Sequence, residues 1–354
     1  GVYDDALVVK FRRDGRLDPA FGTAGIRRLS AGVESSGVAL AVQADGKILV
    51  LRLVLAAAQH YLLTRLNADG SVDETYAAAG PTPGTALIDE GQASHALFAV
   101  AAAPDGRAVV AGWADFMPAV GLLRAVNADG TLSGSATAAL GSGGTFTAVA
   151  YDAAHDDFVA AGPLVASPTV HEFAFARAKL TPGGAAVDPG PWTGALAFLS
   201  PGVDTGTPFA LTLDDRGRAV AAGDAGGTRR FAIARLLPGG GPDPNFGPSG
   251  TGIVQVGLDG PGARGVIAAG GKIVAAGADR AAAGQDLDFT LARLNDDGTP
   301  DAAFGANGLV HTDPGGNHGD DEVMALAALP DGRLVVLGAP ASGGLRAYLA
   351  RYWN

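Results

Sequence analysis

The chain contains no cysteine among its 354 residues. Disulfide bonds, thiol catalysis and cysteine-bound metals are therefore excluded, and the redox compartment stays open because a cysteine-free protein can fold in either. Aromatic residues make up only 6% of the chain, so its core must rely on Ala, Val and Leu. Charged residues, at 17%, fall below the quarter that is usual in soluble proteins.

Positive charge is also scarce, because the formal net charge is −11. This excludes a protein that tracks nucleic-acid phosphates with a basic surface, and it disfavours an anionic membrane surface. Apolar runs such as Ala96–Ala103 are far shorter than the ~18 residues of a membrane span, so we expect no membrane insertion. The first residues show no targeting segment, which predicts a cytoplasmic protein or a signal segment outside this chain.

Helix signals are nearly absent, and a repeated unit takes their place. Apolar runs of five to eight residues lie between turn residues and never sustain a 3.6-residue period. Close copies of the stretch Leu291–Gly308 (LARLNDDGTPDAAFGANG) begin at Ala6, Tyr61 and Phe231. A repeat of this kind determines the architecture before any local assignment is made.

The sequence pattern of each unit predicts four short strands. An apolar stretch reaches an Asp-Gly turn, as in Val38–Lys47, and a second strand such as Arg107–Gly112 follows. A third strand of the LARL type leads through an Asp-x-x-Phe-Gly corner to a fourth, as in Gly25–Leu29. The first turn recurs at intervals of roughly 50 to 61 residues.

The sequence therefore predicts an all-β fold, a six-bladed β-propeller of four-stranded repeats of about 55–60 residues, forming a single domain over residues 1–354. An open β-solenoid is disfavoured because its coils are usually shorter. The chain begins with third and fourth strands and ends with first, second and third. We expect Gly25–Leu29 to complete the last blade, so that strands from both termini close the fold and remove sheet edges. A seventh copy of the third strand leaves seven blades as the alternative.

The corner of each unit carries a matched basic residue and acid. Arg65, Arg235 and Arg293 lie eight residues before Asp73, Asp243 and Asp301 respectively. In the unit Val120–Thr169 both partners are replaced, by Ala125 and Ser133, and the corner aromatic is missing as well. This joint loss predicts that each pair is in contact and pins the corner. The aromatics Phe21, Phe246 and Phe304 are predicted to be plugs between blades.

These motifs resemble the delta-60 repeat of bacterial, often surface-associated proteins, over essentially the whole chain. The resemblance implies a β-propeller-like scaffold in a secreted or cell-surface protein, and it brings no catalytic residues.

Motifs for catalysis are missing. The sequence holds no Gly-x-Ser-x-Gly elbow, no phosphate-binding Walker loop and no His-Glu-x-x-His zinc motif. Its six histidines show no ligand spacing. We therefore predict no catalytic residues and no organic cofactor.

One acidic loop, His311–Glu322, departs from the repeat. It gathers oxygen ligands suited to Ca²⁺, and its predicted metal ligands are Asp313, Asn317, Asp320, Asp321 and Glu322. A solvated acidic loop without a metal is the alternative interpretation.

A second unusual loop, Gly112–Ala119, contains Trp113, Phe116 and Met117. An aromatic cluster of this kind is typical of a patch that stacks on sugars or contacts a protein. Burial of the same side chains against a neighbouring blade is the alternative.

The predicted function is a non-catalytic binding or scaffold module, secreted or at the cell surface, acting as a monomer. Its loops would recognise a polysaccharide or a protein, because loops on rigid scaffolds commonly carry function. The alternative is a propeller hydrolase or lyase with an acid/base site in the central depression.

Overall fold

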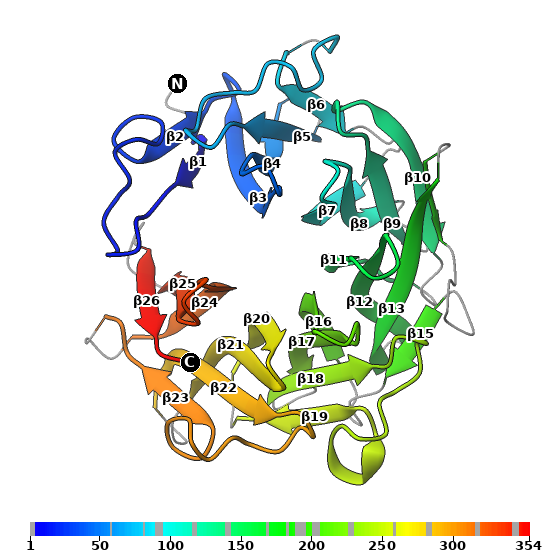
Figure 1. The fold of residues 1–354 in the computed structure, drawn as a ribbon, viewed down its shortest axis with the longest axis vertical. Coiled ribbons are helices and arrows are strands. Elements are labelled where there is room, and N and C mark those ends of the chain that lie inside the picture. Colours follow the sequence, from blue (N-terminus) through cyan, green and yellow to red (C-terminus); the bar gives the residue numbers. More distant parts are fainter. Residues whose placement is uncertain are drawn as a thin grey trace. The chain divides into compact units, whose positions relative to one another are not determined.

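The structure is a computed structural model, and it describes residues 4–56, 59–80, 82–88, 95–114, 119–138, 143–167, 170–181, 184–187, 196–199, 206–225, 230–257, 260–280, 285–315, 319–341 and 347–354. These residues are almost entirely strand and turn, and the single helical element among them is a 3₁₀ turn at Pro248–Gly250 (Figure 1). No helix in this part of the chain has the length and hydropathy of a membrane span.

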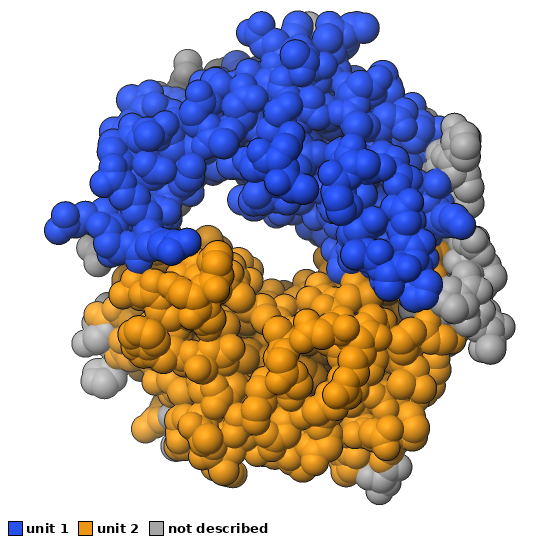
Figure 2. All heavy atoms as spheres, in the orientation of Figure 1, with its two compact units in different colours: residues 1–139, 149–158, 178–187 blue, residues 140–148, 159–177, 188–354 orange. Residues whose placement is uncertain are grey.

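The chain divides into two compact units, coloured separately in Figure 2. Unit 1 consists of Gly1–Ala139, Val149–Phe158 and Ala178–Val187, and unit 2 consists of Leu140–Ala148, Val159–Arg177 and Asp188–Asn354.

Unit 1 contains three complete antiparallel sheets. The first pairs β1 with β2, the second has the order β3-β4-β5-β6, and the third has the order β10-β9-β8-β7. Their strands are β1 (Ala6–Val9), β2 (Ile26–Leu29), β3 (Glu34–Val42), β4 (Ile48–Leu55), β5 (Gln59–Leu66), β6 (Thr85–Ile88), β7 (His95–Ala102), β8 (Ala108–Ala114), β9 (Val120–Val126) and β10 (Leu132–Ala138).

A five-stranded sheet follows in the chain, with the order β11-β12-β13-β14 and with β15 also paired to β13. Its strands are β11 (Ala148–Asp152), β12 (Asp157–Ser167), β13 (Val170–Thr181), β14 (Gly184–Val187) and β15 (Leu196–Leu199).

Unit 2 contains two four-stranded sheets, β16-β17-β18-β19 and β20-β21-β22-β23, and the three-stranded sheet β24-β25-β26. Their strands are β16 (Gly206–Leu213), β17 (Ala219–Ala225), β18 (Arg230–Leu236), β19 (Ile253–Val256), β20 (Gly262–Ala269), β21 (Lys272–Arg280), β22 (Leu287–Asn295), β23 (Leu309–Thr312), β24 (Asp321–Ala328), β25 (Leu334–Pro340) and β26 (Tyr348–Tyr352). The six sheets of three to five strands correspond to the six predicted blades, so the all-β prediction with six blades is confirmed.

The predicted pairing between the chain's two ends is wrong. Ile26–Leu29, the strand expected to complete the last blade, pairs with Ala6–Val9, with Ala6 opposite Leu29. The seventh copy of the third strand, Ala6–Val9, therefore pairs with the fourth strand that follows it in the chain. The two strands are separated by 16 residues of the same chain segment, so their pairing requires less loop closure than pairing between the two ends of the chain.

The Asp-Gly turns form as the sequence predicts. In the first of them Gly46 has φ +82°, a backbone conformation that glycine adopts at little cost. The Asp45 carboxylate accepts a hydrogen bond of 3.0 Å from the Lys47 amide, and Gln43 N donates to Lys47 O at 2.8 Å. The acid and the glycine together fix the tight reversal between β3 and β4.

A β-bulge recurs in the first strand of five blades, where the register shifts at Gly37/Ala39, Leu97/Ala99, Pro208/Ala210, Ala263/Gly265 and Val323/Ala325. In four of these five blades the second strand has a glycine opposite the bulge, namely Gly112, Gly223, Gly277 and Gly338. A Cβ at Gly112 would lie 1.9 Å from Ala96 O. The glycine that ends each VVAG-type strand is therefore required by the close approach of the neighbouring backbone.

Apolar side chains pack between successive sheets. One cluster in unit 1 joins β4 and β5 to β7, β8 and β9 through residues such as Leu51, Leu63, Leu97 and Val110, all at most 1% exposed. In unit 2, a cluster containing Ile233, Phe246 and Ile273 joins β18 to β21. Strand alternation gives each blade two buried faces, so small Ala and Val side chains can fill the space between the sheets.

Candidate metal centre

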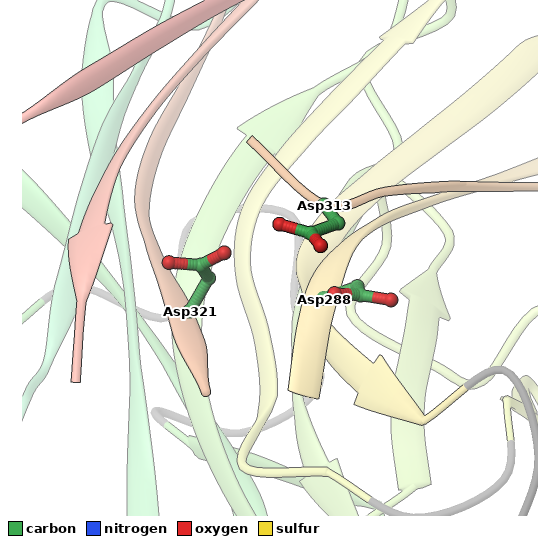
Figure 3. Close-up of side chains that lie close together, drawn as sticks. All are labelled: Asp288, Asp313 and Asp321. Carbon is green, nitrogen blue, oxygen red and sulfur yellow. The ribbon is translucent and has the colours of Figure 1, made fainter. Parts of the chain in front are cut away.

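Three aspartates from different elements of unit 2 come together. Asp288 lies near the start of β22, Asp313 follows the last residue of β23, and Asp321 begins β24. Each offers a carboxylate oxygen, and these three atoms all lie within 4.8 Å of one another. Figure 3 shows the carboxylates of Asp313 and Asp321 turned toward each other, with Asp288 beside Asp313. We call these three residues the aspartate cluster.

Asp321 is the buried member of the aspartate cluster, with 2% of its surface exposed. Its Oδ2 atom has no hydrogen-bond partner within the described residues. Burial raises the pKa of this carboxyl, and the charges of Asp313, Asp288 and Asp320 raise it further. A buried carboxylate with an unpaired oxygen beside other carboxylates requires either a proton or a cation.

The geometry of the aspartate cluster suits Ca²⁺. Calcium binds carboxylate oxygens at about 2.3–2.6 Å, so two oxygens that share one ion lie at most about 5 Å apart. The separation of 4.8 Å or less meets this limit. Mg²⁺ demands near-ideal octahedral geometry, keeps several waters and is usually bound through one or two carboxylates, so a set of three carboxylates suits Ca²⁺ better.

Two of the five predicted metal ligands, Asp313 and Asp321, belong to the aspartate cluster. Asp320 has other contacts: its Oδ1 accepts a hydrogen bond of 2.8 Å from Leu287 N and lies 3.7 Å from Arg280 Nη1. Glu322 is exposed, since it follows Asp321 in β24 and successive strand residues point to opposite faces. Asn317 lies outside the described residues.

The sequence did not reveal Asp288 as a candidate ligand, because this residue lies within a strand of the repeat and outside the acidic loop His311–Glu322. A signal was present in the internal alignment. Asp288 lies one residue before the aromatic that opens the buried part of the third strand, and the corresponding residues in other units are His60 and Arg230. A position that varies between otherwise similar repeats is not fixed by the scaffold.

The aromatic loop is described only in part. Trp113 is half-buried in β8, where it pairs in register with Ala96 on β7 and Gly121 on β9. Phe116 and Met117 lie outside the described residues, so the predicted aromatic patch stays a prediction.

The basic–acidic pairs of the repeat corners are in contact in the structure. Nε of Arg65 lies 2.7 Å from Asp73 Oδ2, Arg235 lies 2.8 Å from Asp243, and Arg293 lies 2.9 Å from Asp301. Each guanidinium also stacks on the corner aromatic, at 4.4 Å for the pairs Arg235–Phe246 and Arg293–Phe304. Tyr76 takes the aromatic place beside Arg65, at 4.5 Å.

The pKa of Asp73 shows how strongly such a corner holds its carboxylate. Burial alone would raise this pKa. Hydrogen bonds from Thr75 and Lys47, together with the bond and charge of Arg65, outweigh burial and hold the pKa far below its usual range.

Each corner also reaches the turn of the next repeat. Lys10 Nζ donates to Ala68 O, and Arg65 Nη1 donates to Ala128 O at 2.6 Å. Arg235 Nη1 and Arg293 Nη1 donate to the side chains of Asp296 and Asn354. All four acceptors occupy the same place in the repeat, three residues after the basic position of the next third strand.

The corner aromatic lies under the glycine of that same turn. Phe21 is fully buried, and a Cβ added at Gly70 would lie 3.0 Å from its ring. Gly298 stands in the same relation to Phe246. A backbone hydrogen bond, such as Gly22 N to Asp69 O at 2.7 Å, completes each junction. We call this combination of basic residue, acid, aromatic and next turn the corner clamp.

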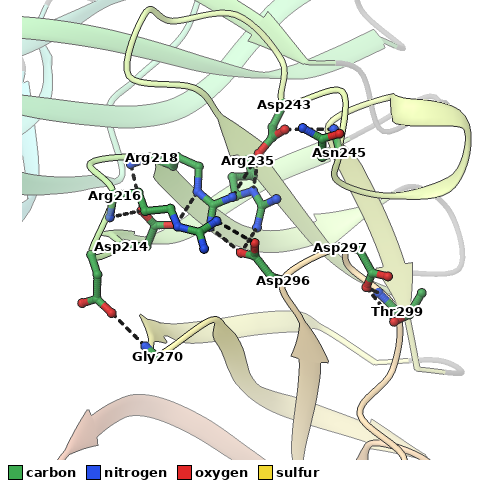
Figure 4. A network of polar contacts seen from close by, with 11 residues as sticks. Asp214, Arg216, Arg218, Arg235, Asp243, Asn245, Gly270, Asp296, Asp297 and Thr299 are labelled. Atoms are coloured by element: carbon green, nitrogen blue, oxygen red, sulfur yellow. Dashed lines mark hydrogen bonds and ion pairs between the residues drawn. The ribbon is translucent and has the colours of Figure 1, made fainter.

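In unit 2 the corner clamp extends into a larger network (Figure 4). Arg218 contacts Asp214, Asp243 and Asp296, and Arg235 contacts the latter two. Arg216 also reaches Asp296, at 2.9 Å. Three arginines thus meet three aspartates, and the charges of the network balance.

Comparison with known proteins supports the fold. The family described as "Domain of unknown function (DUF5122) beta-propeller" matches residues 43–76, 217–246 and 271–304. Each matched segment begins at or next to a first turn, and its later part contains a corner of the repeat. In sequence, the chain matches no curated protein.

Several solved structures are similar to the chain. A Hadza microbial sialidase has a TM-score of 0.49 at 11% identity, and the match covers 89% of this chain and 67% of that one. A glucose dehydrogenase has 0.48 at 15%, covering 90% and 96%. A Pyrococcus horikoshii acylaminoacyl peptidase has 0.47 at 10%, covering 90% and 46%. At these identities and scores the resemblances carry no argument about activity. Together with the six sheets, the family match defines the class: the chain is a β-propeller protein.

Proposed function

We propose that this chain is a non-catalytic binding and scaffold module that holds Ca²⁺ at the aspartate cluster. The observation that carries the proposal is Asp321, a carboxylate that is 2% exposed and faces two further carboxylates, and whose Oδ2 has no hydrogen-bond partner among the described residues. A bound divalent cation would neutralise this charge and tie β24 to β22 and to the end of β23.

The repeat itself supports a scaffold role. The charged and aromatic residues that recur along the chain belong to corner clamps, where they are paired with one another. A feature copied in several blades stabilises the fold and does not form a single active site. The residues that differ between repeats are then left for binding.

The resemblance to delta-60 repeats supports a place outside the cell, in a secreted or surface-displayed bacterial protein. Extracellular calcium modules commonly bind with dissociation constants of about 10⁻⁴–10⁻³ M, which suits a centre with three carboxylates and few other ligands. The macromolecular partner in this proposal is a polysaccharide or a protein, bound through loops by a monomer. The loop that follows Trp113 is the first candidate for such contacts.

Thermal unfolding of the wild-type chain with Ca²⁺, with Mg²⁺ and with a chelator tests the proposal. Ca²⁺ at tenfold excess over its Kd should stabilise the chain by about 1.4 kcal/mol, and the chelator should reverse the effect. Asp321→Asn should remove the response to Ca²⁺. Glu322→Gln is the matched control: it removes the adjacent carboxylate on the opposite face of β24, and it should keep the response. No Ca²⁺ response in the wild type, or equal loss in both variants, would contradict the proposal.

An acid/base hydrolase or lyase is the second candidate, and one observation favours it. The raised pKa of Asp321 beside Asp288 and Asp313 is the pattern by which paired carboxylates divide acid and base roles. This candidate predicts cleavage of a polysaccharide substrate in the presence of chelator, with loss of cleavage in Asp321→Asn. The Ca²⁺ module predicts no cleavage under those conditions.

A further inference from the structure

Arg52 breaks the repeat at a position where the scaffold elsewhere uses glycine. It lies in β4 opposite Gly37, at the β-bulge of the first strand. The same place in the second strand holds Gly112, Gly223 and Gly338 in other blades. In those blades the facing backbone would collide with a Cβ. The first blade thus replaces its usual glycine with the largest cationic side chain.

The guanidinium of Arg52 is buried, with 4% of the residue exposed. Its Nη1 donates to Leu29 O at 3.0 Å and its Nη2 donates to Thr64 Oγ1 at 3.2 Å, while Nε has no partner within the described residues. Both partners are neutral. Burial lowers the pKa of Arg52, and the charge of Asp5 opposes that change only in part. Asp5 is itself paired with Arg28.

Arg52 lines a cavity of about 460 Å³ in unit 1. Eleven described residues line it; none of these is Asp or Glu, and His60 is the only other one among them with an ionisable side chain. Apolar walls come from Val54, Leu62 and Leu87, and hydroxyl groups from Ser30, Thr82 and Thr85. In a chain of net charge −11, a cavity whose described lining holds a buried arginine and no acid is a local site of positive charge.

The topology explains why this cavity is open. One face of the sheet β3–β6 carries Val50, Arg52 and Val54, because alternate residues of a strand share a face. The opposite face packs against β7–β10. On the first face, the two-stranded sheet β1–β2 covers Val50 and Leu66. The part with Arg52, Val54 and His60 borders the cavity instead.

We propose that this cavity binds a small organic carboxylate, whose single negative charge pairs with Arg52. Planar guanidinium groups recognise carboxylates through charge-assisted hydrogen bonds, and the Arg52 guanidinium, whose hydrogen-bond partners among the described residues are neutral, lines the cavity. The apolar walls would hold the body of the ligand, and the hydroxyl groups would orient it. One cation matches one negative charge, so a dianion such as phosphate would leave charge uncompensated in a partly apolar site. The proposal is independent of the aspartate cluster, which lies in unit 2.

Calorimetric titration with two matched pairs of probes tests this inference. Benzoate and benzamide share an apolar ring and differ in charge, whereas glucuronate and glucose share a sugar ring and differ in the same way. We expect at least one carboxylate to bind about tenfold or more tightly than its neutral counterpart. Benzoate binding would indicate an apolar acid, and glucuronate binding would indicate a sugar acid.

Variants then assign the preference to Arg52. Arg52→Met removes the charge and keeps much of the volume, while Arg52→Gly restores the residue that the other blades use, so it should keep the fold. Both should abolish the preference for the carboxylate. Ala31→Phe, at the edge of the cavity, should weaken all cavity binding. Arg16→Met removes an exposed arginine of the same unit and should change nothing.

Three results would overturn the inference. The first is equal binding of the charged and neutral probes by the wild type. The second is an unchanged preference in a folded Arg52→Gly protein. The third is that inorganic phosphate binds more tightly than either carboxylate.

Discussion

Two groups of charged residues in unit 2 differ in the balance of their charges. In the network of Figure 4, Arg216, Arg218 and Arg235 meet Asp214, Asp243 and Asp296, so each of these three carboxylates has a cationic partner. In the aspartate cluster, carboxylate oxygens of three aspartates lie within 4.8 Å of one another, and within the described residues Asp321 Oδ2 has no hydrogen-bond partner. Balanced charges can be explained by folding alone, whereas an excess of one sign calls for a proton or an ion. Charge balance therefore separates scaffold from candidate site.

The sequence position of each group agrees with this distinction. Arg235 and Asp243 belong to the repeat and recur as Arg65–Asp73 and Arg293–Asp301. Asp288 and Asp313 have no such counterpart in the repeat pattern. The unit with Ala125 lacks the corner altogether. There β10 runs from Leu132 to Ala138 directly after the turn, in place of the corner and four-residue strand found elsewhere.

The largest expected effect on the free energy of unfolding comes from removing Arg235 from the balanced network. Asp243, which is 1% exposed, would lose its closest cationic partner, and Arg218 at 3.3 Å would compensate only in part. We expect Arg235→Met to lower the free energy of unfolding by about 3 kcal/mol, measured by urea denaturation. Arg216→Met is the control, because this exposed arginine should contribute at most about 1 kcal/mol. Similar losses in the two variants would argue against a special role for the buried pair.

Introducing an arginine where the corner is missing sharpens the same comparison. Ala125 is 1% exposed and has no acid eight residues later, since Ser133 lies there in β10. We expect Ala125→Arg to destabilise the chain by about 1–3 kcal/mol in urea, because the side chain overpacks the blade and finds no prepared partner. A gain in stability would mean that the basic residue works without the rest of the corner clamp.

Neutralising Asp321 of the aspartate cluster should stabilise the chain, whereas the two preceding substitutions should destabilise it. The pKa of Asp321 is raised in the folded state, so the folded chain binds a proton more readily than the unfolded chain. Its contribution to stability is thus fullest at acidic pH, below the unfolded value, and is lost as pH rises through the folded value. In chelator at neutral pH, Asp321→Asn should stabilise the chain by about 1–2 kcal/mol. The gain should shrink in acid and in Ca²⁺, and a gain independent of pH would count against the like-charge explanation.

Tyr76 allows a finer test of the corner clamp. Its hydroxyl oxygen is buried and has no hydrogen-bond partner in the described part of the chain, and burial raises the pKa of this hydroxyl. Other corners have Phe at this place, so Tyr76→Phe should stabilise the chain by about 1 kcal/mol while keeping the contact with Arg65. A loss of stability on urea denaturation would indicate a partner for the hydroxyl.

The smallest expected effect is the coupling between Arg293 and Asp301. Both side chains are partly exposed, at 13% and 8%, and Lys272 also lies 2.8 Å from Asp301. A double-mutant cycle with Arg293→Met and Asp301→Asn should give a coupling of about 0.5–1 kcal/mol. Zero coupling would mean that the shared position in the repeat does not reflect a direct interaction.

The repeat made much of the fold predictable from sequence. Six units, their Asp-Gly turns and the contact between Arg293 and Asp301 follow from comparing copies within one chain. The pairing of Ile26–Leu29 was not predictable in this way. Two copies of the third strand, one near each end of the chain, could pair with it, and the repeat pattern does not distinguish between them. The recurrent β-bulges were missed as well. The only sequence signal of a bulge is a glycine in the partner strand. Arg52 is unusual because it occupies the position of that glycine in the first blade.

The aspartate cluster was predictable in part. Asp313 and Asp321 lie in the acidic loop His311–Glu322, which the sequence identified as a candidate metal site. Asp288 lies 25 residues before Asp313 in sequence, and the pairing of β22 with β23 brings the two residues together. Glu322 lies outside the aspartate cluster, which the sequence did not indicate because loop composition does not show where β24 begins. Once Asp321 is the first residue of that strand, alternation turns Glu322 to the other face.

A crystal structure of the chain grown with Ca²⁺ tests the central claim most directly. We predict a calcium peak in the anomalous difference map, coordinated by carboxylate oxygens of Asp288, Asp313 and Asp321 at about 2.3–2.6 Å. An ordered cluster with no such peak, or a calcium ion bound at other residues while these three carboxylates contact only water or one another, would contradict the account.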